Sequence, residues 1–263
     1  MKLLRILIII SLTTMHSFSQ TPKKAEIVSL KGTDIYYEVY GEGEALLLLH
    51  GYTQSSKSWW PYVDDYASDF EVYLVDLKGH GQSSPFTENL SIKAAASDLD
   101  ALVRYLQLDS IHAIGFSYGG DVLFQLALLH PGLIQSMISI GACGFWDVDD
   151  HPDWVDYLAY KNIDNLPWMH EQQSSEAQIR SILDQFPNYR VSVSDEELKS
   201  IQTRTLFVLG DQDDSIPLEY ISRARKNLPH SFLWILPNTG HSAHRDKNKA
   251  DFIRLSKAFF SER

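Results

Sequence analysis

The sequence predicts an α/β fold, with a mostly parallel central sheet flanked by helices and an inserted helical cap. Short apolar runs bounded by turn residues have the length of buried strands, and segments with helical periodicity separate many of them. Strands that alternate with helices are joined by crossovers, so neighbouring strands run parallel. The cap is predicted because this alternation stops between residues 145 and 200.

Seven apolar runs are interpreted as strands. They are residues 35–40, 45–49, 72–75, 111–114, 137–140, 206–209 and 232–236. They are short apolar stretches bounded by turn residues, which is typical of buried strands. The sequence therefore predicts a sheet in the middle of the molecule.

Helical periodicity is clearest between Ile92 and Leu106. Apolar residues there recur at intervals of three and four, which gathers them on one face of a helix. The same spacing follows Gly120 and returns near the C-terminus. The residues that carry these two patterns are Val122, Leu126 and Leu129, and then Phe252, Leu255 and Phe259.

The segment 145–200 is interpreted as a cap inserted into one domain, with residues 20–144 and 201–263 forming the core. It has weak helical periodicity and no clear strand, and no linker or repeat suggests a second domain. Its aromatic side chains either line an apolar pocket or join the cap to the sheet, and the sequence leaves both open. These residues are Phe145, Trp146, Trp154, Tyr157, Tyr160 and Trp168.

The composition excludes several classes of protein. A hydrophobic share of 44% and a charged share of 22% are those of a folded chain. Cys143 is the single cysteine, so no disulfide can form within the chain. Lys and Arg total 23 against 34 Asp and Glu, a formal charge of −11, which disfavours binding to nucleic acid.

The N-terminus resembles a secretory signal peptide over residues 1–19. Lys2 and Arg5 accompany an apolar run of about ten residues, and Ser17 and Ser19 are small residues placed for cleavage after Ser19. We expect an exported protein, periplasmic or secreted, with no membrane span after cleavage. An uncleaved anchor is the alternative, although the run is much shorter than the ~20 residues of a spanning helix.

The strongest local motif is residues 115–120, Gly-Phe-Ser-Tyr-Gly-Gly, which follows a predicted strand and precedes a predicted helix. A sharp strand-to-helix turn of this kind holds a serine in a strained conformation, and Gly115 and Gly119 leave room for the close backbone contacts. Ser117 is therefore the candidate nucleophile. Its place at a helix N-terminus also favours a nearby oxyanion.

A serine nucleophile needs a base and an acid that orients the base. His241 is the preferred base because it follows Gly240 just past the last predicted strand, with His230 and His244 as alternatives. Asp213 is the preferred acid because it follows the strand 206–209 and gives the chain order Ser, Asp, His. Asp211 and Asp214 are the alternatives.

Residues 50–52, His-Gly-Tyr, follow the strand 45–49. A tight turn there would direct the backbone N–H of Tyr52 toward Ser117, and the N–H of Tyr118 would supply the second donor of an oxyanion hole. We expect a structural, hydrogen-bonded role for His50.

Together these motifs resemble the α/β-hydrolase fold superfamily, in its serine-nucleophile branch of esterases and lipases. The likeness spans about residues 30–260 and includes residues 76–83, Asp-Leu-Lys-Gly-His-Gly-Gln-Ser, and the pair Gly240-His241. It implies catalytic roles for Ser117, Asp213 and His241, and oxyanion roles for the N–H groups of Tyr52 and Tyr118. Lys78 departs from the arginine common in relatives.

The expected function is a serine hydrolase that cleaves a small carboxylic ester through an acyl-enzyme, without a metal or organic cofactor. The same machinery also cleaves amides, thioesters or carbon–carbon bonds next to a carbonyl in other proteins, because the elbow does not determine the leaving group. A ligand-binding protein that kept this fold without turnover is a further alternative. The sequence indicates neither the physiological substrate nor the oligomeric state.

Overall fold

The structure is a computed structural model that describes residues 21–262. The predicted signal peptide, residues 1–19, lies outside the described residues. Within them, no helix has the length and apolar character needed to cross a membrane.

The seven predicted strands are all present, each longer than predicted by one to three residues. The strands are β1 (Lys24–Leu30), β2 (Thr33–Tyr40), β3 (Glu44–Leu49), β4 (Phe70–Val75), β5 (Ile111–Phe116), β6 (Ile134–Ile140), β7 (Phe145–Asp147), β8 (Arg190–Ser192), β9 (Arg204–Gly210) and β10 (Ser231–Leu236). The α-helices are α1 (Val63–Tyr66), α2 (Ile92–Tyr105), α3 (Tyr118–Leu129), α4 (Pro152–Tyr157), α5 (Trp168–Gln172), α6 (Glu176–Gln185), α7 (Asp195–Ser200), α8 (Leu218–Asn227) and α9 (Lys249–Ser261).

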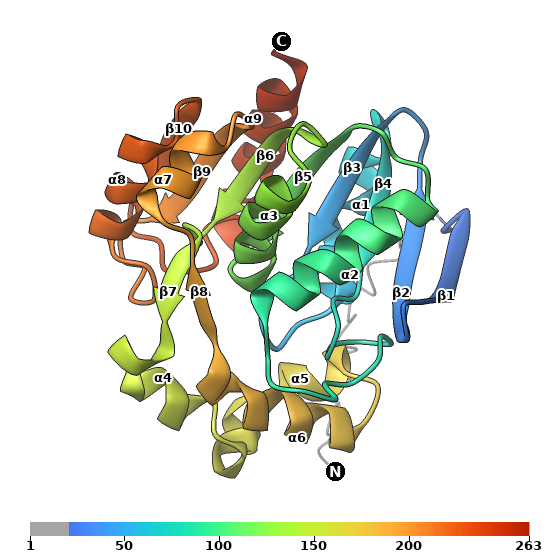
Figure 1. Cartoon of the computed structure of the whole chain (residues 1–263), viewed down its shortest axis with the longest axis vertical. Coiled ribbons are helices and arrows are strands. Elements are labelled where there is room, and N and C mark those ends of the chain that lie inside the picture. Colours follow the sequence, from blue (N-terminus) through green and yellow to red (C-terminus); the bar gives the residue numbers. More distant parts are fainter. Residues whose placement is uncertain (1–20, 263) are drawn as a thin grey trace, which may run out of the picture.

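The main sheet has eight strands in the order β1-β2-β4-β3-β5-β6-β9-β10. The neighbouring strands in the part of this order that runs β4-β3-β5-β6-β9-β10 pair in parallel. The pairs β1 with β2 and β2 with β4 are antiparallel. The predicted fold class, an α/β fold with a mostly parallel central sheet, is therefore confirmed. Figure 1 shows helices on both faces of this sheet.

Both faces of the sheet are covered, which explains the continuous leucine run of β3. Leu47 and Leu49 belong to a hydrophobic cluster that includes α2 and α3, whereas Leu46 and Leu48 belong to a second cluster with α1 and α9. Successive side chains of a strand point to opposite faces, so a strand buried on both sides has no polar position.

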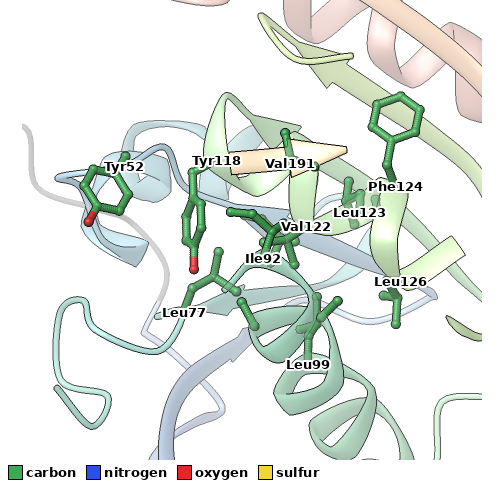
Figure 2. Close-up of a cluster of buried hydrophobic side chains, with 14 of the residues drawn as sticks. Tyr52, Leu77, Ile92, Leu99, Tyr118, Val122, Leu123, Phe124, Leu126 and Val191 are labelled. Carbon is green, nitrogen blue, oxygen red and sulfur yellow. The ribbon is translucent and has the colours of Figure 1, made fainter. Parts of the chain in front are cut away.

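Helices α2 and α3 pack against each other through the predicted apolar positions. Ile92 and Leu99 of α2 lie in one cluster with Val122 and Leu126 of α3. Figure 2 shows this cluster, with Tyr52 and Tyr118 at one end and Phe124 at the other. The packing fixes the direction of α3, and with it the strand-to-helix turn that carries Ser117.

The sequence analysis missed strand β1. Its residues alternate between exposed and partly buried, and it pairs antiparallel with β2 at the edge of the sheet. An edge strand with one solvated face has no continuous apolar run. The pattern that revealed the central strands is therefore absent here.

The segment 145–200 leaves the sheet after β6 and returns to it before β9. Figure 1 shows α4, α5 and α6 together on the side of the sheet toward which β3 and β6 point. The interpretation that this segment has no strand was wrong, because β7 and β8 form a separate antiparallel pair. Each has only three residues, too few for a recognisable alternation.

Candidate active site

Ser117 lies in the sharp turn between β5 and α3, with φ of 50° and ψ of −113°. This is strained backbone for a residue with a Cβ atom. The turn is held by the Ser117 N–H, which donates to the Ile140 carbonyl at 2.8 Å. A Cβ on Gly115 would lie 2.5 Å from the Gly120 nitrogen, so this close approach requires glycine.

His241 and Asp213 form a hydrogen-bonded pair. His241 Nδ1 lies 2.9 Å from Asp213 Oδ2. The other carboxylate oxygen accepts the backbone N–H groups of Ser215 and Ile216, at 2.9 and 3.0 Å. The carboxylate is thereby fixed, and the imidazole is held so that Nε2 is the ring nitrogen available to take a proton.

Gly141 allows the pair to sit close to the end of β6. A Cβ at this position would lie 2.8 Å from His241 Cε1 and 3.3 Å from Asp213 Oδ2. Its φ of +56° also favours glycine. The sequence analysis missed this residue, although a glycine directly after a predicted strand was the available signal.

The loop that carries Tyr52 is joined directly to the elbow. The Gly119 N–H donates to the His50 carbonyl at 3.1 Å, and the rings of Tyr52 and Tyr118 meet edge to face with centroids 5.5 Å apart. Tyr118 is the first residue of α3, so its N–H has no carbonyl partner within the helix. The two residues expected to supply oxyanion donors therefore flank one site.

Ser117, His241 and Tyr52 line a single pocket with a volume of about 240 Å³. The structure thus brings the three triad candidates together, because Asp213 is bonded to His241. Residues of the cap that line this pocket are aromatic or apolar. These are Trp146, Trp154, Tyr157, Leu158, Trp168, Phe186 and Tyr189.

Comparison with known proteins agrees with this architecture. A family model described as alpha/beta hydrolase fold matches residues 44–172. A meta-cleavage product hydrolase from Pseudomonas fluorescens IP01 superposes with a TM-score of 0.76 and 21% identity, covering 90% of this chain and 97% of that one. Naproxen esterase from Bacillus subtilis gives 0.74 and 23%, covering 90% and 91%. The chain has the α/β-hydrolase fold.

Curated relatives of this chain match over shorter stretches. An uncharacterized protein of Mycobacterium tuberculosis is 31% identical over 123 residues, which are 47% of this chain and 36% of the relative. Pimeloyl-[acyl-carrier protein] methyl ester esterase of Salmonella heidelberg is 34% identical over 110 residues, 41% of each chain. The matches therefore span well under half the length of these relatives.

The family model ends at residue 172, before the acid and the base. Their assignment in this α/β-hydrolase fold therefore depends on the geometry, which distinguishes the alternatives. His244 is buried, with its ring centroid 5.1 Å from that of Trp59 and 4.8 Å from that of Phe116. His230 is exposed in the turn before β10. Neither residue lines the pocket.

The alternative acids have other surroundings. The carboxylate of Asp211 accepts the backbone N–H of Thr239 at 3.1 Å, within the loop that precedes His241. Asp214 is exposed, and its nearest polar partner is the Ser215 hydroxyl at 3.5 Å. Only Asp213 among the three carboxylates bonds to His241 in the described part of the chain.

His50 has the structural role that the sequence predicted. Its Nε2 accepts the Leu77 N–H at 3.0 Å, so Nδ1 carries the hydrogen and donates to the Gly51 carbonyl at 2.8 Å. Burial lowers the pKa of His50 to about 4, which keeps the ring neutral. The residue joins the loop of residues 50–52, named the oxyanion loop for its expected role, to the loop after β4.

Most aromatic residues of the cap take one of the two roles that the sequence left open. Trp146, Trp154, Tyr157 and Trp168 line the pocket. Phe145 instead packs against Tyr220 of α8 and so joins the cap to the core. Tyr160 has neither role, because it lies beneath the Arg180 guanidinium of α6, within the cap itself.

Asp121 is a pocket residue that the sequence analysis did not select. It lies one turn after Ser117, and its carboxyl accepts the Tyr189 hydroxyl at 2.9 Å and the Gly144 N–H at 3.1 Å. Burial raises the pKa of Asp121 to about 7. An acid in the first turn of a helix is common on dipole grounds alone, so the sequence offered no specific signal.

The described residues contain no cluster of three or more His, Cys, Asp or Glu side chains suited to a metal ion. Cys143 is buried, and its thiol donates to the Phe145 carbonyl. Burial raises the pKa of this thiol, so it is not activated as a nucleophile.

Proposed function

We propose that the protein is a serine hydrolase that cleaves a small carboxylic ester through an acyl-enzyme. The observation that carries the proposal is the hydrogen bond between His241 and Asp213 in the pocket that also contains strained Ser117. A buried carboxylate, an oriented imidazole and a serine that lines the pocket at a helix N-terminus are the parts that acyl transfer needs.

The first half of the reaction forms the acyl-enzyme. Ser117 Oγ attacks the ester carbonyl carbon as its proton passes to His241 Nε2. The N–H groups of Tyr52 and Tyr118 hold the oxyanion of the tetrahedral intermediate. The intermediate then collapses and expels the alcohol, which takes the proton from His241. Asp213 stabilises the imidazolium throughout and is not itself protonated.

The second half releases the acid. A water molecule gives a proton to His241 and attacks the acyl carbonyl, and the oxyanion forms again between the same two N–H groups. Collapse breaks the bond to Ser117 Oγ, which recovers the proton from His241. No metal or organic cofactor takes part in this proposed scheme.

The relatives support an ester as substrate. The Salmonella relative is named as a methyl ester esterase, and the Bacillus structure as a carboxylesterase. The Pseudomonas structure is named as a meta-cleavage product hydrolase. The apolar cap lining and the volume of about 240 Å³ suit a small ester with an apolar portion.

Replacement of the nucleophile tests the proposal. Ser117→Ala should lower kcat/KM for nitrophenyl esters by about 10⁴-fold or more and leave the unfolding midpoint close to wild type. A fluorophosphonate probe should label the wild-type chain at Ser117. Ser222→Ala, at an exposed position on α8, is the control and should retain full activity.

Two outcomes would contradict the proposal. Unchanged esterase activity in Ser117→Ala would assign the chemistry to another residue. A wild-type chain that binds esters but is neither labelled nor active would instead be a binding protein with this fold. A parallel series of amides and thioesters identifies the bond that is cleaved fastest.

We also propose that the protein is exported, with cleavage after Ser19. The basic residues, apolar run and small residues of segment 1–19 support this. Cell fractionation with N-terminal sequencing should find the chain outside the cytoplasm and beginning at Gln20. A cytoplasmic chain that retains segment 1–19 would contradict it.

A further inference from the structure

A second cavity opens beside the catalytic pocket. It is a groove with a volume of about 660 Å³. Gln54, Trp168 and Ser242 line both cavities, and Ser242 directly follows the candidate base. The two cavities are therefore adjacent, with these three residues at their common boundary, and a molecule bound at Ser117 would reach the groove across that boundary.

The groove has a positive lining in an acidic protein. Lys57, Arg245 and Lys249 line it, with Asp246 as the only acidic residue among its lining residues in the described chain. The whole chain has a formal charge of −11. Three cations around one cavity are thus opposite in sign to the average surface, which is the distribution that attracts an anionic ligand.

Arg245 is a partly buried cation of the groove. Its Nη2 donates to Gln54 Oε1 at 2.9 Å, and its Nε lies 3.3 Å from His244 Nε2. Over residues 21–262, no carboxylate oxygen lies within 4.0 Å of its guanidinium. Burial lowers the pKa of Arg245, although the group remains charged. A partly buried cation without a carboxylate partner favours the binding of an anion, because the anion compensates its charge.

The two lysines differ in how their charges are compensated. Lys57 Nζ donates to the Glu171 carbonyl at 2.7 Å and has no carboxylate partner within 4.0 Å in the described chain. Lys249 Nζ lies 3.9 Å from Asp65 and donates to the Pro61 carbonyl at 2.6 Å. Arg245 and Lys57 therefore have no direct carboxylate partner in the described chain, and the planar guanidinium of Arg245 matches the two oxygens of a carboxylate or phosphate.

We propose that this groove binds a carboxylate or phosphate group carried by the substrate, at the end remote from the bond that Ser117 attacks. The choice of ligand rests on the proposed function, because it places the scissile ester at Ser117. The preferred substrates are then anionic esters, such as monoesters of dicarboxylic acids or esters with a phosphorylated end. Neutral esters of the same length fill the catalytic pocket and leave the groove without a charge partner.

Binding without turnover tests this proposal separately from the catalytic one. The full chain with Ser117→Ala is titrated calorimetrically with monomethyl and dimethyl esters of dicarboxylic acids of increasing length, and with a methyl ester that ends in phosphate. At one length, the monoester or the phosphate ester should bind about tenfold more tightly than the neutral diester. The better of these two anions identifies the preferred group.

Variants of the cations locate the effect. Arg245→Gln in the Ser117→Ala background should remove most of the anionic preference and change the Kd of the diester by less than about twofold. Arg245→Lys should restore part of the preference. Lys57→Gln should weaken anion binding by about threefold, and it gives an independent result if Arg245→Gln fails to fold. Arg225→Gln, at an exposed position on α8, is the control.

Equal affinity for the monoester, the phosphate ester and the neutral diester at every length would overturn the proposal, even if ester hydrolysis is found. Loss of the preference in Arg225→Gln to the same degree as in Arg245→Gln would overturn it too, because the net charge would then be the cause. If the wild-type chain hydrolyses no ester but Ser117→Ala still binds anions selectively, the proposed anion site in the groove would stand and the proposed esterase activity would be rejected.

Discussion

The core and the cap of this molecule are built from different residues. All 14 glycines lie outside residues 145–200, and several of them allow close backbone contacts at the site. The cap holds its position through aromatic rings and side-chain hydrogen bonds instead. The difference indicates that the proposed catalytic site depends on closely packed backbone that tolerates no added Cβ. The wall of the pocket depends on side-chain contacts, which other side chains can also make.

The largest expected effect is on the core side of this comparison. Gly119→Ala would place a Cβ 2.6 Å from the Leu49 carbonyl oxygen and 2.8 Å from that of His50. Alanine normally stabilises a helix relative to glycine, but here the substitution should lower the free energy of unfolding by about 3 kcal/mol because of these close contacts. Esterase activity should fall with it, because the same approach positions the oxyanion loop.

Denaturant unfolding measures this loss, with Gly132→Ala as the matched control. Gly132 has a φ of +87° and no heavy atom within 4 Å of an added Cβ. The control therefore carries only backbone strain, about 1 kcal/mol. A Gly119→Ala chain as stable and active as wild type would show that the elbow and the oxyanion loop can move apart freely.

The sequence predicted the core of the molecule better than the cap. The elbow could be predicted because Gly115 and Gly119 stand at the spacing that such a turn requires, and the structure shows the close approaches that both allow. The sequence preferred His241 to His244 from its place after Gly240, but only the fold shows that the His241 ring meets Asp213 and that His244 packs against Phe116 instead. Strands β7 and β8 pair three residues with three others more than forty positions away, and no local pattern predicts such a contact.

The cap side of the comparison depends on Gln173. Its buried side chain donates to the carbonyls of Thr53 and Gln54, both at 3.0 Å, and accepts the Gly81 N–H at 2.7 Å. Gln173→Ala should lower the free energy of unfolding by about 2 kcal/mol, because it leaves buried backbone groups without partners. The cap amides should lose hydrogen-exchange protection while the central strands keep theirs.

Gln202→Ala removes an exposed glutamine outside the cap and serves as the control. A uniform loss of protection in Gln173→Ala, with β5 and β6 exchanging as fast as the cap, would contradict the comparison. The cap and core would then unfold as one unit.

The smallest expected effect lies where the two regions meet, at Asp121 of the core and Tyr189 of the cap. Burial raises the folded-state pKa of Asp121 from 3.8 to about 7. The folded chain therefore binds a proton that the unfolded chain has released, and stability falls as the pH rises between these two values. From about pH 6 to pH 8 this single group should cost the folded state about 1.4 kcal/mol.

Asp121→Asn removes that titration and preserves the hydrogen-bonding geometry, since its amide donates to the Tyr189 oxygen and its carbonyl accepts the Gly144 N–H. Relative to wild type, the variant should gain about 1.4 kcal/mol between pH 6 and pH 8 in urea unfolding. Asp184→Asn, at an exposed site on α6, should show no such gain. Parallel pH profiles for wild type and Asp121→Asn would mean that Asp121 is ionised in the folded chain at both pH values. The contact between core and cap would then be a charge-assisted hydrogen bond, which the Tyr189 hydroxyl donates to the Asp121 carboxylate.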